Sequence, residues 1–240
     1  MKKERVLLII PAYNEEDCIL NTYNTILDYN KKNSSNYDVI VINDGSTDNT
    51  ANILKKNNIP HINLVHNLGI GGAVQTGYKY AFDNDYDIAV QFDGDGQHDV
   101  RYVKNIISPI IANESNMVIG SRFIEEKSKF KSTAMRRFGI NTISFCIKLF
   151  TGKRIYDTTS GFRACDKEII KRFSSFYPSE YPEPISTVEV LKLKYKISEV
   201  AVEMNERTTG VSSIHSWKNV YYMVNVLLSI IVASLRRYKK

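Results

Sequence analysis

Five short apolar runs, the first four each followed by a helical pattern, limit the folds that this sequence can adopt. The runs are rich in Val and Ile and lack polar alternation, which is typical of strands covered on both faces in a parallel sheet. Repeated alternation of such strands with helices predicts an α/β fold with a doubly wound, mostly parallel sheet. The predicted strands are residues 6–10, 39–42, 62–65, 88–92 and 117–119.

The 240 residues are enough for one large domain with a full hydrophobic core. Ser46 and Asp48 are candidates to cap the second helix. The alternation of strand and helix stops after about Phe123. The predicted helices are residues 17–29, a segment up to about 57, 72–82 and 100–112.

Polar stretches follow four of these strands, at the points where the strands end. In sheets of this kind, ligands bind at the carboxyl ends of the strands. We therefore expect the four stretches to converge on one binding site. They are residues 11–16, 43–48, 66–72 and 93–98.

The stretch QFDGDGQHD, residues 91–99, crowds like charges directly after a buried strand. Asp93, Asp95 and Gln97 are spaced two apart, so in extended backbone their side chains share one face. Their oxygens suit Mg²⁺ or Mn²⁺, hard cations that are usually shared with substrate phosphates. Without a cation, the carboxylates would raise one another's pKa. A solvated acidic turn is the alternative, and the position at a strand end favours the metal site.

Seven motifs resemble, in their order along the chain, those of family 2 nucleotide-sugar glycosyltransferases. They are PAYNEE, VINDGSTDNT, NLGIGGAVQTG, QFDGDGQHD, GSRF, DTTSGFR and NERTTGVSSI. More narrowly, the chain resembles the branch that includes dolichol-phosphate mannose synthase and bacterial polyprenyl-phosphate glycosyltransferases. The resemblance covers about residues 6–214 and implies a type A, Rossmann-like nucleotide-sugar transferase fold. It implies an enzyme that moves a hexose from a nucleotide sugar, with UDP favoured over GDP.

The resemblance also implies which residues bind the nucleotide. Asp44 is expected to contact the base or the ribose. Gly69 and Gly71 would let the backbone approach the nucleotide, or would only permit a turn. The other residues expected around the nucleotide are Pro11, Ala12, Tyr13, Glu15 and Asp93.

Four residues are expected to carry the transfer step, beginning with Asp95 and its metal. Arg122 follows the fifth strand, where its planar fork is placed to meet phosphate oxygens. Asp157 would contact sugar hydroxyls or orient the acceptor, and Arg207 resembles the family's phosphate-binding arginine. Arg163 is either structural or part of the site. We expect inversion by one in-line displacement, with the metal and the arginines stabilising the leaving diphosphate.

The nature of the acceptor decides whether such an enzyme needs a base. A hydroxyl must lose a proton as it attacks, whereas a lipid monophosphate, with a second pKa of about 6, is already largely ionised near neutral pH. Many hydroxyl-directed relatives carry a Glu-Asp pair where this chain has Glu183 followed by Pro184. The missing carboxylate favours a polyprenyl phosphate, with Glu183 and Asp157 as the remaining candidate bases. The residues expected to hold the acceptor phosphate are Arg136, Arg207 and Ser212, with Ser213 nearby.

Two amphipathic segments are expected to meet the membrane. Residues 133–151 combine a polar stripe with a broad apolar face and basic flanks, which fits an interfacial helix or a core-packed one. The apolar stretch 220–235 is shorter than the ~20 residues that a spanning helix needs. We expect a catalytic domain over 1–215 that includes the first segment. The segment 216–240 would be a helix that anchors on the membrane surface or docks on a small membrane subunit or a second copy.

Charge and cysteine content bear on compartment and partners. The formal net charge is +6, and the basic clusters suit phosphates or anionic headgroups, or form a solvated face. The lack of a recognition motif argues against nucleic acid. Three scattered cysteines favour a reduced cytosolic protein, and the apolar run before Pro11 is too short for a signal peptide.

We therefore expect a peripheral enzyme on the cytoplasmic face of the cell membrane, acting in cell-wall or surface-glycan assembly. One alternative is a hydroxyl-directed transferase that extends a surface polysaccharide. The other is a catalytically silent nucleotide-binding protein.

Overall fold

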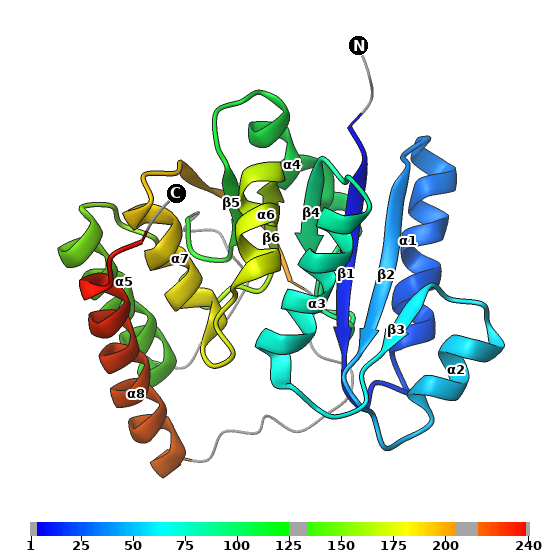
Figure 1. The fold of residues 1–240 in the computed structure, drawn as a ribbon, viewed down its shortest axis with the longest axis horizontal. Helices are drawn as coiled ribbons and strands as arrows, with labels where there is room; N and C mark the ends of the chain where they lie inside the picture. The colour runs from blue at the N-terminus through cyan, green and yellow to red at the C-terminus, as the bar shows by residue number, and fades with distance from the viewer. Residues whose placement is uncertain (1–3, 125–133, 205–215, 239–240) are drawn as a thin grey trace.

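The computed structural model describes residues 4–124, 134–204 and 216–238, apart from the side chains of residues 134–136 and 216–222. Strands and helices alternate along the described chain (Figure 1). The strands are β1 (Val6–Ala12), β2 (Tyr37–Asn43), β3 (His61–Asn63), β4 (Ile88–Gln91), β5 (Met117–Ser121), β6 (Arg163–Asp166) and β7 (Ile197–Ala201). The helices are α1 (Ile19–Asn33), α2 (Thr50–Lys56), α3 (Gly69–Asp83), the 3₁₀ turn η1 (Val100–Tyr102), α4 (Val103–Ile111), α5 (Ala134–Thr151), α6 (Lys167–Ser175), α7 (Pro182–Lys192) and α8 (Ser216–Leu235).

The strands form one seven-stranded sheet in the order β3-β2-β1-β4-β6-β5-β7. β6 runs antiparallel to β4 and β5, and the other neighbours are parallel. The predicted doubly wound, mostly parallel sheet is therefore confirmed. The five strands expected from the sequence correspond to β1–β5. The sequence did not predict β6, which is inserted between β4 and β5, or β7 at the edge.

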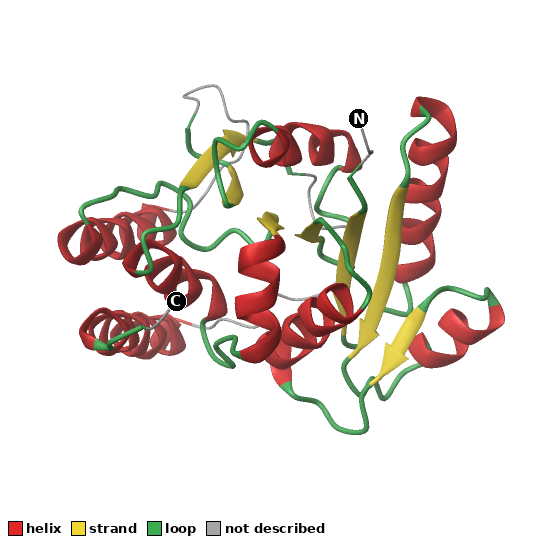
Figure 2. Cartoon of the chain, turned by 45° about the horizontal axis from the view of Figure 1, so that its top comes forward, coloured by secondary structure: helices red, strands yellow, loops and turns green. Residues whose placement is uncertain are grey.

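Helices cover both faces of the sheet, as the apolar strands require (Figure 2). All seven residues of β1 are buried. Leu7 and Ile9 face a core shared with α3, α5, α6, α7 and α8, whereas Leu8 and Ile10 face a core shared with α1, α2 and α4. Because both faces are covered, ligands can reach this part of the sheet only at the strand ends.

The helix expected at residues 133–151 is present as α5, and it divides its apolar side chains between two environments. Ile143 and Ile147 are fully buried in the core, which agrees with a core-packed helix. Phe138 and Phe145 are 74% and 65% exposed on its outer side. Ser144, expected on the polar stripe, is instead buried at 1% exposure.

The C-terminal helix α8 lies beside α5 in both ribbon views, and it also packs on α7 (Figures 1 and 2). Its Val226 and Ile230 are fully buried and belong to the same core as the inner side of α5. Its outer side exposes apolar residues, with Leu228 at 55% and Val232 at 68%. Among the residues that the structure describes, no helix is both long and apolar enough to cross a bilayer.

Candidate active site

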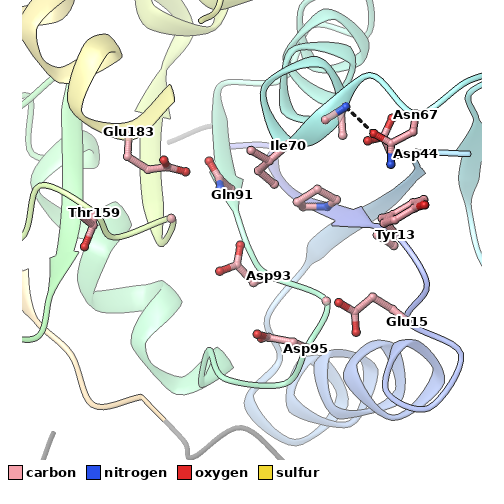
Figure 3. Close-up of a pocket in the computed structure, with 16 residues that line it drawn as sticks. Tyr13, Glu15, Asp44, Asn67, Ile70, Gln91, Asp93, Asp95, Thr159 and Glu183 are labelled. Carbon is pink, nitrogen blue, oxygen red and sulfur yellow. Dashed lines mark hydrogen bonds between the residues drawn. The ribbon is translucent and has the colours of Figure 1, made fainter. Parts of the chain in front are cut away.

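A pocket of about 540 Å³ lies at the carboxyl ends of β1, β2 and β4. The four polar stretches expected to converge all contribute to it, together with residues 159–161 and the start of α7. In the view of Figure 3, Asp44 and Tyr13 lie toward one end, Glu183 and Thr159 toward the other, and Asp93 between them. The lining residues are Pro11, Ala12, Tyr13, Glu15, Asp44, Asn67, Gly69, Ile70, Ala73, Gln91, Asp93, Gly94, Asp95, Thr159, Gly161 and Glu183.

Hydrogen bonds lock the loop after β1 to the loop after β2. Asn14 has a left-handed backbone, with φ of 55°, and its Oδ1 accepts from the Thr47 N–H at 2.8 Å. Ser46 Oγ accepts from the Asn14 N–H at 3.0 Å, so Ser46 bonds to this neighbouring loop. The N-cap of α2 is Asn49, without a side-chain cap, and not Ser46 or Asp48 as predicted; Asp48 Oδ1 accepts from the Thr50 N–H at 2.9 Å just before the helix. The two loops therefore form one rigid wall of the pocket.

Asp44 closes the end of the pocket beside Tyr13. It is 3% exposed, and its Oδ1 accepts from the Leu68 N–H at 2.7 Å, which ties β2 to the start of α3 (Figure 3). Tyr13 and Ile70 are 47% and 43% exposed at the rim, where they offer apolar surface to a planar base. This end of the pocket combines a buried hydrogen-bond acceptor with flat apolar contacts.

The two glycines at the start of α3 play different parts. Gly69 lines the pocket with φ of +76°, a backbone conformation that favours glycine. Gly71 is buried and does not line the pocket. A methyl group at Gly71 would lie 2.2 Å from the Pro178 carbonyl oxygen. Gly71 therefore lets the segment before α7 pack closely against α3. The close approach to a nucleotide, one of the two roles expected for this glycine, is not seen there.

His98 holds the loop that carries Asp93, a role that the sequence did not predict. Its Nδ1 accepts from the Asp93 N–H at 2.9 Å, and its Nε2 lies 3.4 Å from Asp93 Oδ2. The ring is stacked on Phe162, with 4.6 Å between the centroids. Burial lowers the pKa of His98 to about 4, so the ring is neutral near pH 7. Since Nδ1 accepts, Nε2 carries the proton.

Asp93 and Asp95 both bring carboxylates to the pocket, as a metal site at this strand end requires. Asp95 Oδ1 accepts from the Gln97 N–H at 3.0 Å, and Gln97 does not line the pocket. The structural role of Gln97 is to fix the Asp95 carboxylate through its own backbone N–H. The described residues contain no cluster of three or more His, Cys, Asp or Glu placed to hold an ion. The donor set therefore fits a hard cation that takes further oxygens from a bound diphosphate and water.

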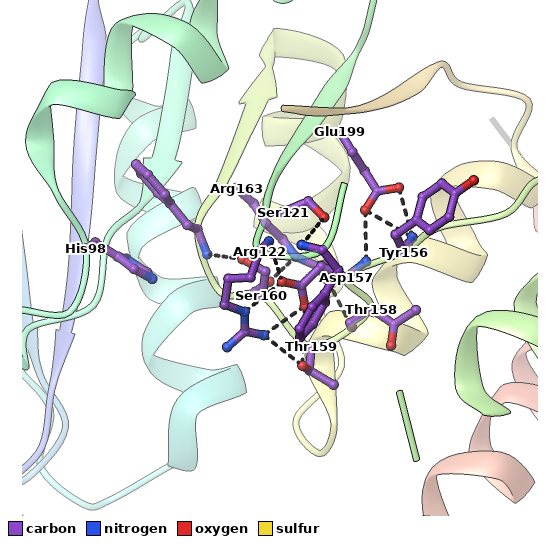
Figure 4. Close-up of polar contacts among 12 residues, drawn as sticks. His98, Ser121, Arg122, Tyr156, Asp157, Thr158, Thr159, Ser160, Arg163 and Glu199 are labelled. Carbon is purple, nitrogen blue, oxygen red and sulfur yellow. Dashed lines mark hydrogen bonds and ion pairs between the residues drawn. The ribbon is translucent and has the colours of Figure 1, made fainter. Parts of the chain in front are cut away.

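Arg122 and Asp157 form a buried ion pair beside the pocket (Figure 4). Arg122 is 6% exposed and Asp157 is fully buried. The guanidinium donates from Nε to Asp157 Oδ2 at 2.7 Å and from Nη2 to Oδ1 at 2.8 Å. Glu199, on β7, accepts from the Asp157 N–H at 2.8 Å. The two side chains were expected to meet phosphate and sugar, but the structure has them bind each other and fix the segment that brings Thr159 and Gly161 to the pocket.

Arg163 has a structural role, which was one of the two alternatives expected from the sequence. It is 1% exposed and donates from Nη1 to the Glu183 carbonyl oxygen at 2.8 Å and to Ser186 Oγ and Thr187 Oγ1, both at 3.1 Å. These bonds join β6 to the first turn of α7. They place the Glu183 side chain on the pocket wall, where burial raises the pKa of its carboxyl and the Arg163 charge opposes that rise.

The residues expected to hold the acceptor phosphate fall outside this description. Arg207, Ser212 and Ser213 lie outside the described residues, as does the side chain of Arg136. They stay predictions from the sequence.

The fold and the strand-end pocket define a glycosyltransferase of the type A fold. Residues 7–174 match the family model described as Glycosyl transferase family 2, and the chain belongs to that family. It is a nucleotide-sugar-dependent glycosyltransferase, as the sequence motifs predicted.

Known relatives agree with this assignment. The chain is 35% identical over 216 residues to the UDP-N-acetylglucosamine–dolichyl-phosphate N-acetylglucosaminyltransferase of Methanococcus voltae, covering 82% of this chain and 84% of the relative. It is 26% identical to the undecaprenyl-phosphate mannosyltransferase of Micrococcus luteus, covering 87% and 86%. The glucosyl-3-phosphoglycerate synthase of Mycobacterium tuberculosis, crystallised with Mn²⁺, UDP and phosphoglyceric acid, shares the fold. That match has a TM-score of 0.69 at 15% identity, covering 98% of this chain and 80% of that one.

Proposed function

We propose that this chain transfers a sugar from a UDP-sugar to a polyprenyl phosphate at the cytoplasmic face of a membrane, with Mg²⁺ or Mn²⁺. The observation that carries the proposal is the pocket, in which the carboxylates of Asp93 and Asp95 lie between the end with Asp44 and Tyr13 and the end with Glu183. The names of the relatives above, which act on dolichyl and undecaprenyl phosphates, support a lipid phosphate as acceptor.

The buried carboxylate of Asp44 supports uracil as the base. One of its oxygens is already bonded to the Leu68 N–H. Uracil presents a single ring N–H on its pairing edge, so one carboxylate oxygen suffices to bind it. Guanine presents a ring N–H beside an amino group, and a carboxylate binds that pair best with both oxygens available. Asp44 therefore favours UDP over GDP.

The divalent cation would be held by Asp95 and Asp93 on the pocket wall. When bound, it supplies Lewis-acid neutralisation of the charge that develops on the leaving diphosphate. The chain's own contribution is to fix the two carboxylates. The Gln97 N–H fixes Asp95, and His98 fixes Asp93.

The reaction that fits this site needs no base. An acceptor phosphate oxygen attacks the anomeric carbon and forms the new C–O bond, while the bond to UDP breaks and UDP leaves with the electron pair. The attacking oxygen carries no proton to remove, because a phosphate monoester is largely ionised near neutral pH. Burial of Asp157 in its ion pair leaves Glu183 as the carboxyl group at the far end of the pocket. One displacement inverts the anomeric configuration.

The outer sides of α5 and α8 suit contact with a lipid surface. Both expose apolar side chains, and the exposed basic residues Arg137, Lys148, Arg236 and Arg237 lie on or directly after these helices. An apolar face with basic flanks is the composition of an interfacial helix. The exposed apolar residues are Phe138, Phe145, Leu149, Val224, Leu228, Ile231, Val232 and Leu235.

Phe145→Glu is expected to weaken binding to vesicles that contain anionic lipid. Burying a Phe side chain is worth about 1.5–3 kcal/mol, so the partition coefficient should fall by about tenfold or more. Co-sedimentation with vesicles measures it. Phe82→Glu is the matched control, because Phe82 is 46% exposed on α3, away from this face. Equal binding of both variants and the wild type would show that α5 does not face the lipid.

Transfer itself is tested by incubating the full chain with radiolabelled UDP-sugars, Mn²⁺ and undecaprenyl phosphate. Label should move into the organic phase, should not do so with undecaprenol, and should stop moving when the cation is chelated. Label that stays in the aqueous phase on a polysaccharide acceptor would favour the hydroxyl-directed alternative. Turnover that persists under chelation would reject the metal-dependent mechanism.

A further inference from the structure

Gln91, the last residue of β4, has a buried polar atom without a partner. The side chain is 1% exposed, and its Oε1 has no hydrogen-bond partner among the described residues. Leaving a buried acceptor unpaired destabilises the fold, whereas an apolar side chain of the same shape would not. An unpaired amide oxygen on a pocket wall indicates that a bound ligand donates a hydrogen bond to it.

The neighbours of Gln91 enclose one corner of the pocket. The Glu183 carboxyl group lies beside its side chain on the pocket wall (Figure 3), close enough that Gln91 lowers the pKa of that carboxyl. Gly161 passes so close that a methyl group there would lie 2.9 Å from Gln91 Nε2 and 3.2 Å from the Asp93 carboxylate oxygens. Gln91 lines the pocket at this corner, between Glu183 and Ile70 in the view of Figure 3.

We propose that Gln91 Oε1 accepts a hydrogen bond from an O–H or N–H group of the transferred sugar, which makes Gln91 a specificity-determining residue and Glu183 the positioning residue that holds its amide. The inference rests on the proposed function, because it takes the ligand to be a nucleotide sugar.

The parts of the two substrates differ in whether they can donate a hydrogen bond to Gln91 Oε1, and this difference favours the transferred sugar. Diphosphate oxygens and an ionised acceptor phosphate carry only hydrogen-bond acceptors, so they cannot satisfy a carbonyl oxygen. The base and ribose belong at the Asp44 end. The sugar follows the diphosphate, which Asp93 and Asp95 flank, and its hydroxyl or acetamido groups supply the donor that Oε1 lacks.

The test compares Gln91→Met with the wild type by calorimetric titration of UDP, UDP-glucose and UDP-N-acetylglucosamine in the presence of Mn²⁺. UDP lacks the transferred sugar, so its affinity should stay within about twofold, which also shows that the variant is folded. Affinity for the nucleotide sugar should fall about tenfold, the effect of one lost hydrogen bond to a buried group. A loss confined to UDP-N-acetylglucosamine assigns the acetamido N–H, and an equal loss for both sugars assigns a hydroxyl.

The role of Glu183 is tested by two variants. Glu183→Gln can still accept from the Gln91 amide and should keep the wild-type affinity for both nucleotide sugars. Glu183→Ala should weaken the binding of the same nucleotide sugars that Gln91→Met weakens, again with UDP affinity kept. Gln75→Met is the matched control, because Gln75 is half-buried on α3 outside this pocket, and it should bind all three ligands as the wild type does.

Two results separate the failure of this inference from the failure of the proposed function. If the wild type binds UDP and UDP-sugars but Gln91→Met weakens them equally, or weakens neither, the role of Gln91 is overturned and the proposed function stands. If the wild type binds none of them, the proposed function itself fails.

Discussion

Asp95→Ala is expected to lower the rate of sugar transfer by at least about 100-fold while leaving the protein folded. A metal at the leaving diphosphate supplies several kcal/mol of transition-state stabilisation, and each 1.4 kcal/mol is tenfold in rate. Asp95 is partly exposed on a loop after β4, so its loss removes little packing. The measurements are kcat with saturating UDP-sugar and the calorimetric affinity for UDP with and without Mn²⁺. In the variant, Mn²⁺ should no longer strengthen UDP binding.

Asp99→Ala is the matched control for this prediction. Asp99 lies four residues further along the same loop, outside the pocket, and its carboxylate bonds to Arg101. Its loss should leave kcat within about twofold, because a surface ion pair of this kind is screened by solvent. If the two variants lose activity equally, the effect belongs to the loop. If Asp95→Ala keeps its activity, the metal assignment is wrong.

The first half of the chain could be predicted because its signals are local. Each of β1–β5 is an apolar run covered on both faces, and the strand-end rule then places Asp44 and Asp93 at one edge. No knowledge of distant residues is needed for either step. The same reasoning brings Tyr13 and Asp95 to the pocket, where the structure has them.

The parts that the sequence did not reveal depend on contacts between distant segments. β6 is only four residues long and contains the buried Arg163, so it lacks the apolar pattern of a strand. In the sequence, Gln91 is only the polar last residue of a predicted strand. The fold is needed to show that α7 brings Glu183 beside it. His98 could have been noticed from its place in the acidic stretch, but its ring is stacked on Phe162, which comes from a distant segment of the chain.

Arg122 and Asp157 have side chains of the types that bind substrates, but both are buried and bind each other. Either side chain alone, placed after a strand or in a polar loop motif, suits contact with a charged or hydroxylated substrate. The structure pairs them across 35 positions of sequence, so each satisfies the other. Pairing over that separation leaves no local signal in the sequence.

Asp157→Ala is therefore expected to reduce the free energy of unfolding by about 3–5 kcal/mol, because it leaves the buried Arg122 guanidinium without its carboxylate partner. Urea denaturation followed by circular dichroism measures the change. Replacing both partners, as Arg122→Met with Asp157→Leu, should cost clearly less than Asp157→Ala alone, since no uncompensated charge remains. The exposed Lys79–Asp83 pair supplies the control, and Asp83→Ala should leave the urea midpoint close to that of the wild type. A wild-type midpoint for Asp157→Ala together with lost transfer would instead assign Asp157 to the substrate, as its sequence motif first suggested.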